Sequence, residues 1–285
     1  MKSKLASWLL LIVAMSWGLA FVTMKDALGR QSVNSSLFYR FALATIALLI
    51  VHPQIIKKID KDIIKHGGIT GLFLAAGFIL QTYGLDMTGA AVTGFITGLY
   101  VVATPLFEQF FGGKKLGNIV WVSIGIATTG LALLSLKGFS VGIGELLVLL
   151  SALCYTGQII GLSKWSEGRD VWAMTFMQIF VVAIVTGIAA LIEGFQTPPD
   201  NGVWGVIVFT AIVCTVTAFV VQTWSQAIIE STKAAVIMTM EVVFSALFAI
   251  TLGGEVLSLR TLIGGLLVVI SMYTIVFHES KPAND

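Results

Sequence analysis

Charged residues are scarce in this chain of 285 residues, in which only 11% of the positions are Asp, Glu, Lys or Arg. Soluble domains carry roughly 25% of these residues. Here 57% of the residues are apolar and the mean hydropathy is +0.95. A water-soluble fold of this size would lack the charge to cover its surface. The composition therefore indicates that lipid is the solvent around most of the chain.

Cysteine, histidine and clustered charge are also sparse. The two cysteines, Cys154 and Cys214, lie in apolar runs, which excludes a disulfide framework and a cysteine metal cluster. The net charge of +2, without a dominant basic block, excludes intrinsic disorder and nucleic-acid binding. No His, Asp or Glu cluster has metal-ligand spacing, and no Gly-Lys-Ser/Thr phosphate loop is present. We therefore expect no metal, no cofactor and no direct use of ATP.

The chain instead has a series of long apolar stretches. A helix needs roughly 20 mostly apolar residues to cross the hydrocarbon core of a bilayer. The stretches lack the period-two alternation of membrane β-strands, so the predicted fold class is an all-α membrane protein with ten transmembrane helices. The expected spans are residues 5–24, 35–51, 68–85, 90–111, 118–136, 144–162, 171–192, 203–227, 234–252 and 261–277.

The distribution of Lys and Arg predicts the orientation of these spans. If the N-terminus lies in the cytoplasm, most of the 17 Lys and Arg residues fall on the cytoplasmic side, Lys57, Lys58 and Lys61 among them. We therefore expect a multi-pass protein of the cell inner membrane or plasma membrane with both termini cytoplasmic. Ten helices suffice to enclose a path in one chain, so a monomer is expected, with a dimer as the alternative.

The second half of the chain resembles the first at a shift of 141 residues. Gln81-Thr82 matches Gln222-Thr223, and Gly112-Gly113 matches Gly253-Gly254. The shift covers five helices and, because five is odd, the second copy enters the membrane from the opposite face. Residues 1–138 and 139–285 are therefore expected to form two inverted five-helix repeats. Such repeats are typical of secondary transporters, which bind solute near the midplane between the halves.

Several motifs carry a resemblance to a known family. They read Trp17-Gly18-Leu19-Ala20-Phe21 in the first span, Gln81-Thr82-Tyr83-Gly84-Leu85 in the third, and Met240-Glu241-Val242-Val243 in the ninth, which closes on Gly253-Gly254-Glu255. Across the whole chain they resemble the EamA-like branch of the drug/metabolite transporter superfamily. The resemblance implies a central cavity lined by spans 1, 3, 4, 6, 8 and 9, alternating access, and export of amino acids and related metabolites. One departure is Val242, where many relatives have Pro.

Ionisable residues within the spans are the first candidates for a site, because a charge at the bilayer centre costs at least about 2.5–3.5 kcal/mol. Glu241 lies deep in the ninth span and is expected to recognise a substrate ammonium group or to carry a coupling proton. A structural carboxylate is the alternative. Lys25 and Arg40, near the outer ends of spans 1 and 2, are candidates for an outer gate or for binding a substrate carboxylate, with outward snorkelling as the alternative.

Two further residues complete the expected gate. Glu145 begins the sixth span on the same face as Lys25 and Arg40, which makes it a candidate partner for either. Pro105 is expected to bend the fourth span, because proline removes an intrahelical hydrogen bond and such bends are tolerated where a helix lines a cavity. Packing alone is the alternative explanation for Pro105.

Aromatic and amide side chains fall on the spans that the resemblance assigns to the cavity. An aromatic wall suits amphipathic substrates and offers cation–π contact with an ammonium group, whereas packing or lipid contact is the alternative for each ring. Gln81 and Gln222 occupy equivalent repeat positions and are candidate gate residues at opposite mouths, with interhelical hydrogen bonding as the alternative. The aromatic candidates are Trp17, Tyr83, Tyr100, Tyr155 and Trp224.

The sequence therefore predicts a secondary active transporter that exports small organic metabolites across the cytoplasmic membrane by alternating access. Amino acids and their analogues are the expected substrates. The other expected partners are the lipid bilayer and, through Glu241, a coupling proton. A passive channel or facilitator for small solutes is the alternative. A membrane-embedded enzyme is not expected, because no catalytic side chains cluster at one depth.

Overall fold

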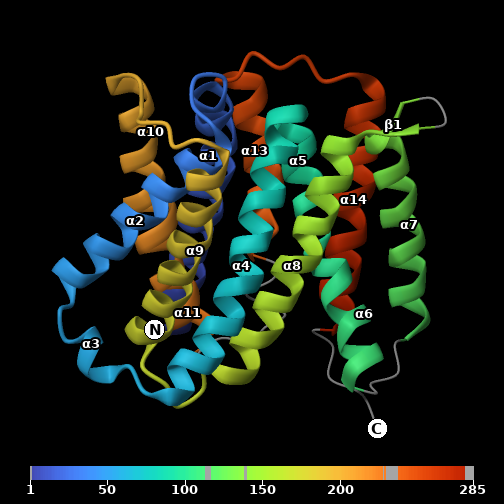
Figure 1. Cartoon of the computed structure of the whole chain (residues 1–285). Helices are drawn as coiled ribbons and strands as arrows, with labels where there is room; N and C mark the ends of the chain where they lie inside the picture. The colour runs from blue at the N-terminus through green and yellow to red at the C-terminus, as the bar shows by residue number, and fades with distance from the viewer. Residues whose placement is uncertain (1, 113–116, 138–139, 227, 229–236, 280–285) are drawn as a thin grey trace, which may run out of the picture.

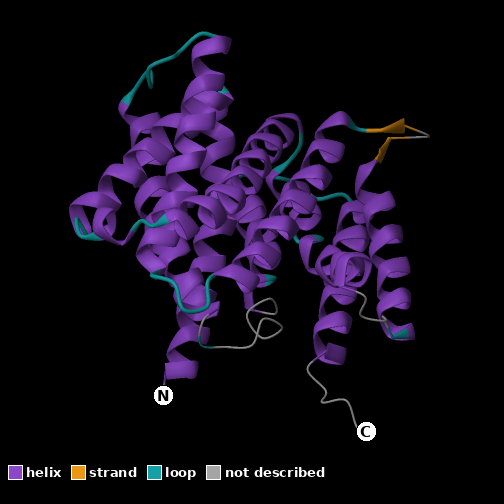
Figure 2. Ribbon diagram, turned by 60° about the horizontal axis from the view of Figure 1, so that its bottom comes forward, coloured by secondary structure: helices purple, strands orange, loops and turns teal. Residues whose placement is uncertain are grey.

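The computed structural model of the chain describes residues 2–112, 117–137, 140–226, 228 and 237–279 (Figure 1). These residues are almost entirely helical, apart from one short antiparallel hairpin in which Leu136 pairs with Val141 (Figure 2). The elements are α1 (Lys2–Leu28), α2 (Val33–Val51), α3 (Ile55–Lys58), α4 (Lys61–Met87), α5 (Ala90–Thr97), α6 (Tyr100–Gly112), α7 (Asn118–Ser135), β1 (Leu136–Lys137), β2 (Ser140–Val141), α8 (Ile143–Trp165), α9 (Val171–Glu193), α10 (Asn201–Ala211), the π-helix η1 (Ile212–Thr217), α11 (Ala218–Gln226), α13 (Met240–Thr251) and α14 (Leu259–Glu279).

Six of the described helices are long and apolar enough to cross a membrane by length and composition. They are Lys4–Leu28, Val33–Val51, Lys61–Met87, Ile143–Trp165, Val171–Glu193 and Asn201–Ser225. The shorter apolar helices are Ala90–Thr104, Asn118–Leu134, Met240–Thr251 and Leu259–Thr274. These helices fall within or across the stretches expected from hydropathy. The fold is therefore that of a helical, multi-pass membrane protein.

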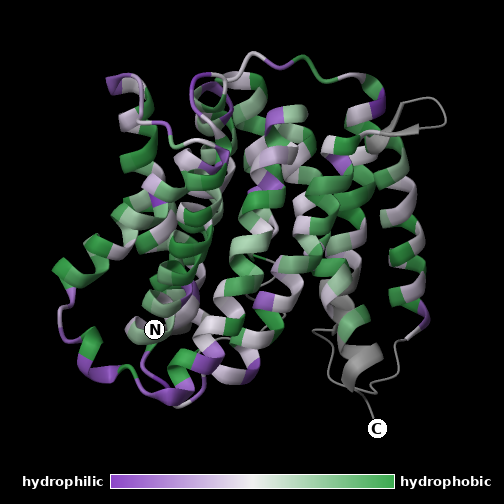
Figure 3. Ribbon diagram, viewed as in Figure 1, coloured by the Kyte–Doolittle hydropathy of each residue, from purple (hydrophilic) through white to green (hydrophobic). Residues whose placement is uncertain are grey.

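The surface and the interior have the polarity expected of a bundle in lipid. Hydrophobic residues run along the middles of the helices, and hydrophilic residues gather toward their two ends (Figure 3). Ile50 and Leu191 are 76% and 73% exposed. In contrast, Gln158 of α8 is buried and donates a hydrogen bond from Nε2 to Oε1 of Gln178 on α9 at 2.9 Å. Lipid accepts the exposed apolar side chains, whereas the buried amides require partners within the protein.

Aspartates fix where three of the helices begin. Asp60 accepts a hydrogen bond from the Ile63 amide at 2.8 Å, so α4 begins at Lys61, ahead of the expected start at residue 68. Asp170 caps α9 in the same way, and Asp200 caps α10 through the amides of residues 202 and 203. These side chains satisfy amide groups that have no partner within the first helical turn. Hydropathy alone misses the polar first turn of α4.

Two of the expected spans are irregular. Residues 90–111 are divided between α5 and α6, because the α-helix is interrupted at Gly98 and Leu99. This interruption precedes Pro105, which lies within α6 and whose side chain is outside the described part of the structure. Residues 201–226 contain the π-helix η1, where the Thr215 hydroxyl donates to the carbonyl oxygen of Thr210, five residues earlier, at 2.9 Å. Such π-turns are rare and frequently occur at functional sites.

Helix packing brings the two halves of the chain together. Helix α4 packs on α8 and α9, α2 on α9, α7 on α14, and α13 on α1 and α5. The contact of α1 with α13 requires glycine, because a Cβ on Gly18 would lie 2.7 Å from the backbone nitrogen of Ser245. In both cartoon views the described chain starts and ends toward the same side of the bundle (Figure 1 and Figure 2).

Candidate functional site

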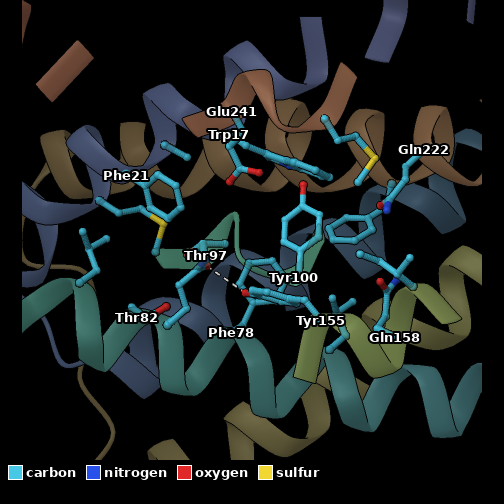
Figure 4. A pocket seen from close by; sticks show the side chains of 18 of the residues that line it. Trp17, Phe21, Phe78, Thr82, Thr97, Tyr100, Tyr155, Gln158, Gln222 and Glu241 are labelled. Atoms are coloured by element: carbon cyan, nitrogen blue, oxygen red, sulfur yellow. Dashed lines mark hydrogen bonds between the residues drawn. The ribbon is translucent and has the colours of Figure 1, made fainter. Parts of the chain in front are cut away.

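A cavity lies inside the bundle, between helices of both halves of the chain (Figure 4). About 670 Å³ of space lies between its lining atoms, counting the part that opens to solvent. The cavity is lined by Trp17, Ala20, Phe21, Met24, Arg40, Leu74, Phe78, Gln81, Thr82, Leu85, Thr97, Tyr100, Tyr155, Gln158, Ile159, Phe219, Gln222, Met238 and Glu241.

Aromatic rings from five helices, α1, α4, α6, α8 and α11, form much of the wall. Trp17 of α1 lies with its ring centroid 5.7 Å from that of Phe219 on α11. Phe78 of α4 contacts Tyr155 of α8 edge-on, also at 5.7 Å. Offset or edge-to-face ring pairs of this kind pack favourably. The wall is therefore apolar, polarisable and shared by both halves of the chain.

A hydrogen-bonded chain of side chains fixes one side of the cavity. The Tyr155 hydroxyl donates to Oε1 of Gln81 at 2.9 Å, and Nε2 of Gln81 donates to the hydroxyl of Thr97 at 3.0 Å. These contacts join α8, α4 and α5. Interhelical hydrogen bonding was the alternative to a gate role for Gln81. Gln81 makes such bonds, and it also lines the cavity.

Arg40 is the cation of the cavity and is only 4% exposed. Its Nε donates to the Thr215 hydroxyl of η1 at 2.9 Å, and Nη1 contacts the Met24 sulfur at 3.3 Å. The guanidinium carbon lies 5.2 Å and 4.9 Å from the ring centroids of Phe41 and Phe78. Sequence position suggested outward snorkelling as an alternative, but the structure buries Arg40 against rings, which stabilise a cation through their π faces.

Glu241 is the anion of the cavity. It lies in the first turn of α13, is 7% exposed and projects into the cavity beside Trp17 (Figure 4). No described residue donates a hydrogen bond to its carboxylate or pairs with it as a cation, and this includes Arg40. Burying an unpaired carboxylate is costly. The alternative of a structural carboxylate that bonds a neighbouring helix therefore has no support among these residues.

The remaining aromatic candidates divide between the cavity and its surroundings. Trp17, Tyr100 and Tyr155 line the cavity. Tyr83 does not, because its hydroxyl accepts a hydrogen bond from Asn34 at 2.9 Å and donates to the Glu193 carboxylate at 3.1 Å. Trp224 is also absent from the lining and packs against the hydrophobic core.

The expected gate residues lie in different places. Lys25 of α1 donates through Nζ to the carbonyl oxygens of Leu85 at 2.7 Å and of Asp86 at 2.9 Å, and also to that of Thr88, at the C-terminal end of α4. A cation at this helix end is electrostatically favourable. Glu145 is buried in the first turn of α8, whereas Lys25 and Arg40 contact other groups.

A carboxylate binds the N-terminus of α5, the helix that follows the α4 end contacted by Lys25. Glu255, in the loop after α13, accepts hydrogen bonds from the amides of Ala90 at 2.6 Å and Ala91 at 3.4 Å. It thereby satisfies free N–H groups at the N-terminus of α5. Lys25 and Glu255 thus bind the two sides of the α4–α5 turn to α1 and to the α13–α14 loop.

Several lining residues were not singled out from the sequence. On α4 they include Leu74, Phe78 and Leu85, which recur with the helical spacing of Gln81 and Thr82 and so lie on one face. That periodicity was the signal that would have found them. Thr215, which binds Arg40, gave no such signal, because a π-turn interrupts the periodicity of its helix. No group of three or more His, Cys, Asp or Glu residues within the described ranges is arranged to hold a metal ion.

The chain resembles transporters from bacteria and archaea. An uncharacterized transporter of Archaeoglobus fulgidus is 28% identical over 269 residues, which cover 92% of this chain and 83% of the relative. Uncharacterized transporter YyaM of Bacillus subtilis is 24% identical over 274 residues, covering 90% and 88%. The pseudopaline exporter CntI of Pseudomonas aeruginosa is 22% identical over 256 residues, covering 87% of each chain.

The fold is also found in a solved structure. A crystal structure with 16% sequence identity superposes with a TM-score of 0.68, covering 98% of this chain and 99% of its own. The sequence model of the EamA-like transporter family matches residues 4–136 and 142–277. The family and the relatives are named as transporters and not as enzymes. Because the match covers nearly the whole chain, this protein belongs to the EamA-like transporter family.

Proposed function

We propose that this protein is a secondary active transporter that exports small organic metabolites, with amino acids or their analogues as the substrates. The observation that carries the proposal is the cavity, which is lined by aromatic rings, by a buried cation, Arg40, and by a buried anion, Glu241. An amino acid carries one ammonium and one carboxylate group. Each of its charges would therefore find a complement, and its side chain would find apolar or aromatic surroundings.

The transport mechanism that we propose is alternating access by two inverted five-helix repeats, residues 1–138 and 139–285. The packing supports it, since helices at equivalent positions of the two halves pair with each other: α2 with α9, α5 with α13, and α7 with α14. The two ranges matched by the family also fall on either side of residues 137–141. A pair of modules around one central site has two pseudo-equivalent states, each open to one side.

The contacts at the α4–α5 turn support a gate that is closed on this face of the protein. Lys25 and Glu255 both hold the turn between α4 and α5 on that face. We assign this face to the outside, because Lys57, Lys58 and Lys61 lie at the opposite end of the helices. Both termini would then be cytoplasmic, in the inner or plasma membrane, and ten spans in one chain would form a monomeric path with the lipid bilayer around it.

Glu241 is our candidate for a coupling proton. Its carboxylate lies in the cavity without a described partner, so it can exchange between a bound proton and a bound substrate ammonium group. Binding one would then release the other, which is the requirement for antiport at a shared site. The export direction is proposed by analogy with the relative named as a pseudopaline exporter.

The test is transport by the purified protein in proteoliposomes. Amino acids are loaded on one side, and counterflow of radiolabelled substrate is measured with and without a pH gradient. A proton-coupled transporter shows saturation, counterflow and a rate that depends on the pH gradient. The alternative, a passive channel or facilitator, shows no dependence of the rate on the gradient. Glu241→Gln is expected to abolish the pH dependence and to lower the rate at least tenfold. Glu167→Gln, at an exposed loop position, is the matched control and should retain both.

A further inference from the structure

The π-helix η1 presents a threonine hydroxyl to the buried cation of the cavity. Thr215 is 0% exposed, and its hydroxyl donates to the carbonyl oxygen of Thr210 at 2.9 Å. A hydroxyl group has one donor and two lone pairs, so the Thr215 oxygen remains an acceptor once its proton is committed to that carbonyl group. Nε of Arg40 donates to this oxygen at 2.9 Å. The π-turn therefore holds the hydroxyl in the orientation that Arg40 requires.

The same turn is bonded to α1 through Cys214, the residue before Thr215. The Trp17 indole N–H donates to the Cys214 carbonyl oxygen at 2.8 Å, and the Cys214 thiol donates to the Ser16 carbonyl oxygen at 3.4 Å. The two bonds run in opposite directions between the same two segments. Because they hold Cys214 against α1, they also restrict the movement of the adjacent Thr215.

Arg40 has more donors than the described residues satisfy. A guanidinium group carries five N–H donors. Nε binds Thr215, and Nη1 contacts the sulfur of Met24, which is a weak acceptor. Within the described ranges no acidic side chain pairs with Arg40, and Nη2 is unpaired without being completely buried. Because Arg40 lines the cavity, the cavity is the space from which an acceptor can approach Nη2.

The contact with Thr215 also decides which edge of the guanidinium group is free. Two parallel hydrogen bonds to a carboxylate can form through Nε and one terminal nitrogen, or through both terminal nitrogens. Thr215 occupies the first edge at Nε. We propose that Thr215 is a positioning residue, which directs the Nη1–Nη2 edge of Arg40 toward a substrate carboxylate. This inference rests on the proposed function, in which Arg40 is the complement of that carboxylate.

The arrangement predicts discrimination between a carboxylate and a carboxamide. A carboxamide has nearly the same shape but carries no charge, and its NH₂ group would meet the N–H donors of Arg40. Without the Thr215 hydroxyl, the Nε–H of Arg40 would lose its acceptor, and a buried donor without a partner is unfavourable. The guanidinium group would then turn toward another acceptor. Preference for the acid should therefore depend on a hydroxyl group that does not itself bind the substrate.

Binding of two matched probes to the full-length protein in nanodiscs tests the proposal. The probes are L-phenylalanine and L-phenylalaninamide, which share the ring and the ammonium group and differ in the carboxylate. Dissociation constants are measured by isothermal titration calorimetry at about pH 6, where the amino groups are protonated and the carboxyl group is ionised. The wild-type protein should bind the acid roughly 10-fold to 100-fold more tightly, as expected for hydrogen bonds between charged groups.

Single substitutions locate the preference. Thr215→Val keeps the shape of the side chain and removes the hydroxyl, and Thr215→Ala removes the hydroxyl without a branched side chain. Each should lower the ratio of the two affinities roughly tenfold by weakening binding of the acid, and leave binding of the amide within about threefold. Thr215→Ser retains the hydroxyl and should retain the ratio. Arg40→Gln should remove the preference for the acid.

Thr217→Val is the matched control on the same turn. Thr217 is exposed, and its hydroxyl donates to the carbonyl oxygen of Ile212, five residues earlier, at 2.9 Å. Thr217 thus makes the same bond within the turn as Thr215 but has no described contact with Arg40. Its replacement should leave the ratio within about twofold of wild type. Thermal unfolding of each variant verifies that it is folded.

The proposal is overturned if Thr215→Val and Thr215→Ala leave the ratio unchanged or weaken binding of both probes equally. It is also overturned if the wild-type protein shows no preference or binds neither probe at millimolar concentration. The binding assay requires no transport, so the two failures can be told apart. Coupled export with a ratio insensitive to Thr215 would leave the function intact and refute the positioning role. A ratio that collapses in the variants, without coupled transport, would refute the function and support the positioning role.

Discussion

At the scale of single residues, Lys25, Glu255 and Tyr83 lie outside the cavity lining and contact local partners. Lys25 donates hydrogen bonds to carbonyl groups at the end of α4, and Glu255 accepts hydrogen bonds from amides at the start of α5. Tyr83 is engaged by Asn34 and Glu193. Within the cavity, in contrast, Tyr100 and Glu241 lack described partners. Because Tyr100 and Glu241 both line the cavity, they are available to a solute there.

Replacing Lys25 tests its role at the end of α4. Lys25→Met retains most of the apolar stem and removes the donors to three carbonyl groups, so the free energy of unfolding should fall by about 2 kcal/mol. Thermal denaturation in detergent measures the effect. Lys61→Met, at the exposed start of α4, is the control and should remain within about 0.5 kcal/mol of wild type. Equal effects of both variants would show that the contact is not stabilising.

The ion pair of Arg30 with Asp200 should make stability depend on pH. The Val203 amide, with the Arg30 guanidinium at 2.6 Å, holds the pKa of Asp200 below its ordinary value of about 3.9. The folded state thus favours the carboxylate, which stabilises it above about pH 4, and this contribution is lost as the pH falls through the lowered pKa.

Asp200→Asn isolates this charge, because asparagine is also a good helix cap. The melting temperatures of wild type and variant should differ by a constant amount above about pH 5 and converge below pH 4. Asp86→Asn is the control, since the structure gives its carboxylate no partner among the described residues. A gap that widened on acidification would contradict the expected sign.

Sequence reasoning located the important charges better than it located the rings. Glu241 and Arg40 were singled out because the cost of burying a charge is large and independent of helix rotation. Tyr83 and Trp224 were grouped with the cavity rings by type and span alone. The side of a helix that a ring faces depends on packing, and the structure turns both of these residues away from the cavity.

At the scale of elements, hydropathy identified the helices but not their local irregularities. The aspartate cap that extends α4 is polar, and the break at Gly98 lies in an unbroken apolar run. The π-turn at residues 212–217 leaves the composition of its span unchanged. Each of these features depends on backbone hydrogen bonding, to which a count of apolar residues is insensitive.

The seam between α1 and α13 offers a test at this scale. Gly18→Ala would place a Cβ 2.7 Å from the backbone nitrogen of Ser245 and should cost about 1–3 kcal/mol of unfolding free energy. Gly125→Ala, on α7, meets no atom within 4 Å and should stabilise by about 0.5 kcal/mol, because alanine favours helix. Melting temperatures in detergent should therefore shift in opposite directions. A parallel shift would mean that the seam can open to admit a methyl group.

At the scale of the whole molecule, the fold class follows from composition, whereas the pairing of helices does not. Apolar periodicity does not indicate that α4 packs on α8 rather than on another helix. The family resemblance supplied the expected set of cavity helices. It did not supply the size of the cavity or the unpaired atoms in its wall.

Side-specific labelling tests the proposed orientation. Glu167 precedes α9 and Thr197 follows it, and α9 spans 23 residues, or about 35 Å at 1.5 Å per residue. In a background of Cys154→Ser and Cys214→Ser, a membrane-impermeant maleimide added to intact cells should label Thr197→Cys and spare Glu167→Cys. Permeabilised cells should label both positions. Labelling of both in intact cells would contradict a membrane crossing by α9.

The π-turn in the eighth span has a consequence for the cavity. It accommodates one residue more than a regular helical turn, and each residue of an α-helix advances the side-chain direction by about 100°. A helical wheel drawn through residues 201–226 would consequently assign one end of this span to the wrong azimuth. Excising a single residue from 212–217 would restore a regular helical turn and leave the direction of Phe219 and Gln222 nearly unchanged, whereas an excision from the regular helix would rotate the residues beyond it by about 100°. Which side chains line the cavity at this point therefore depends on the number of residues in the turn as well as on their types.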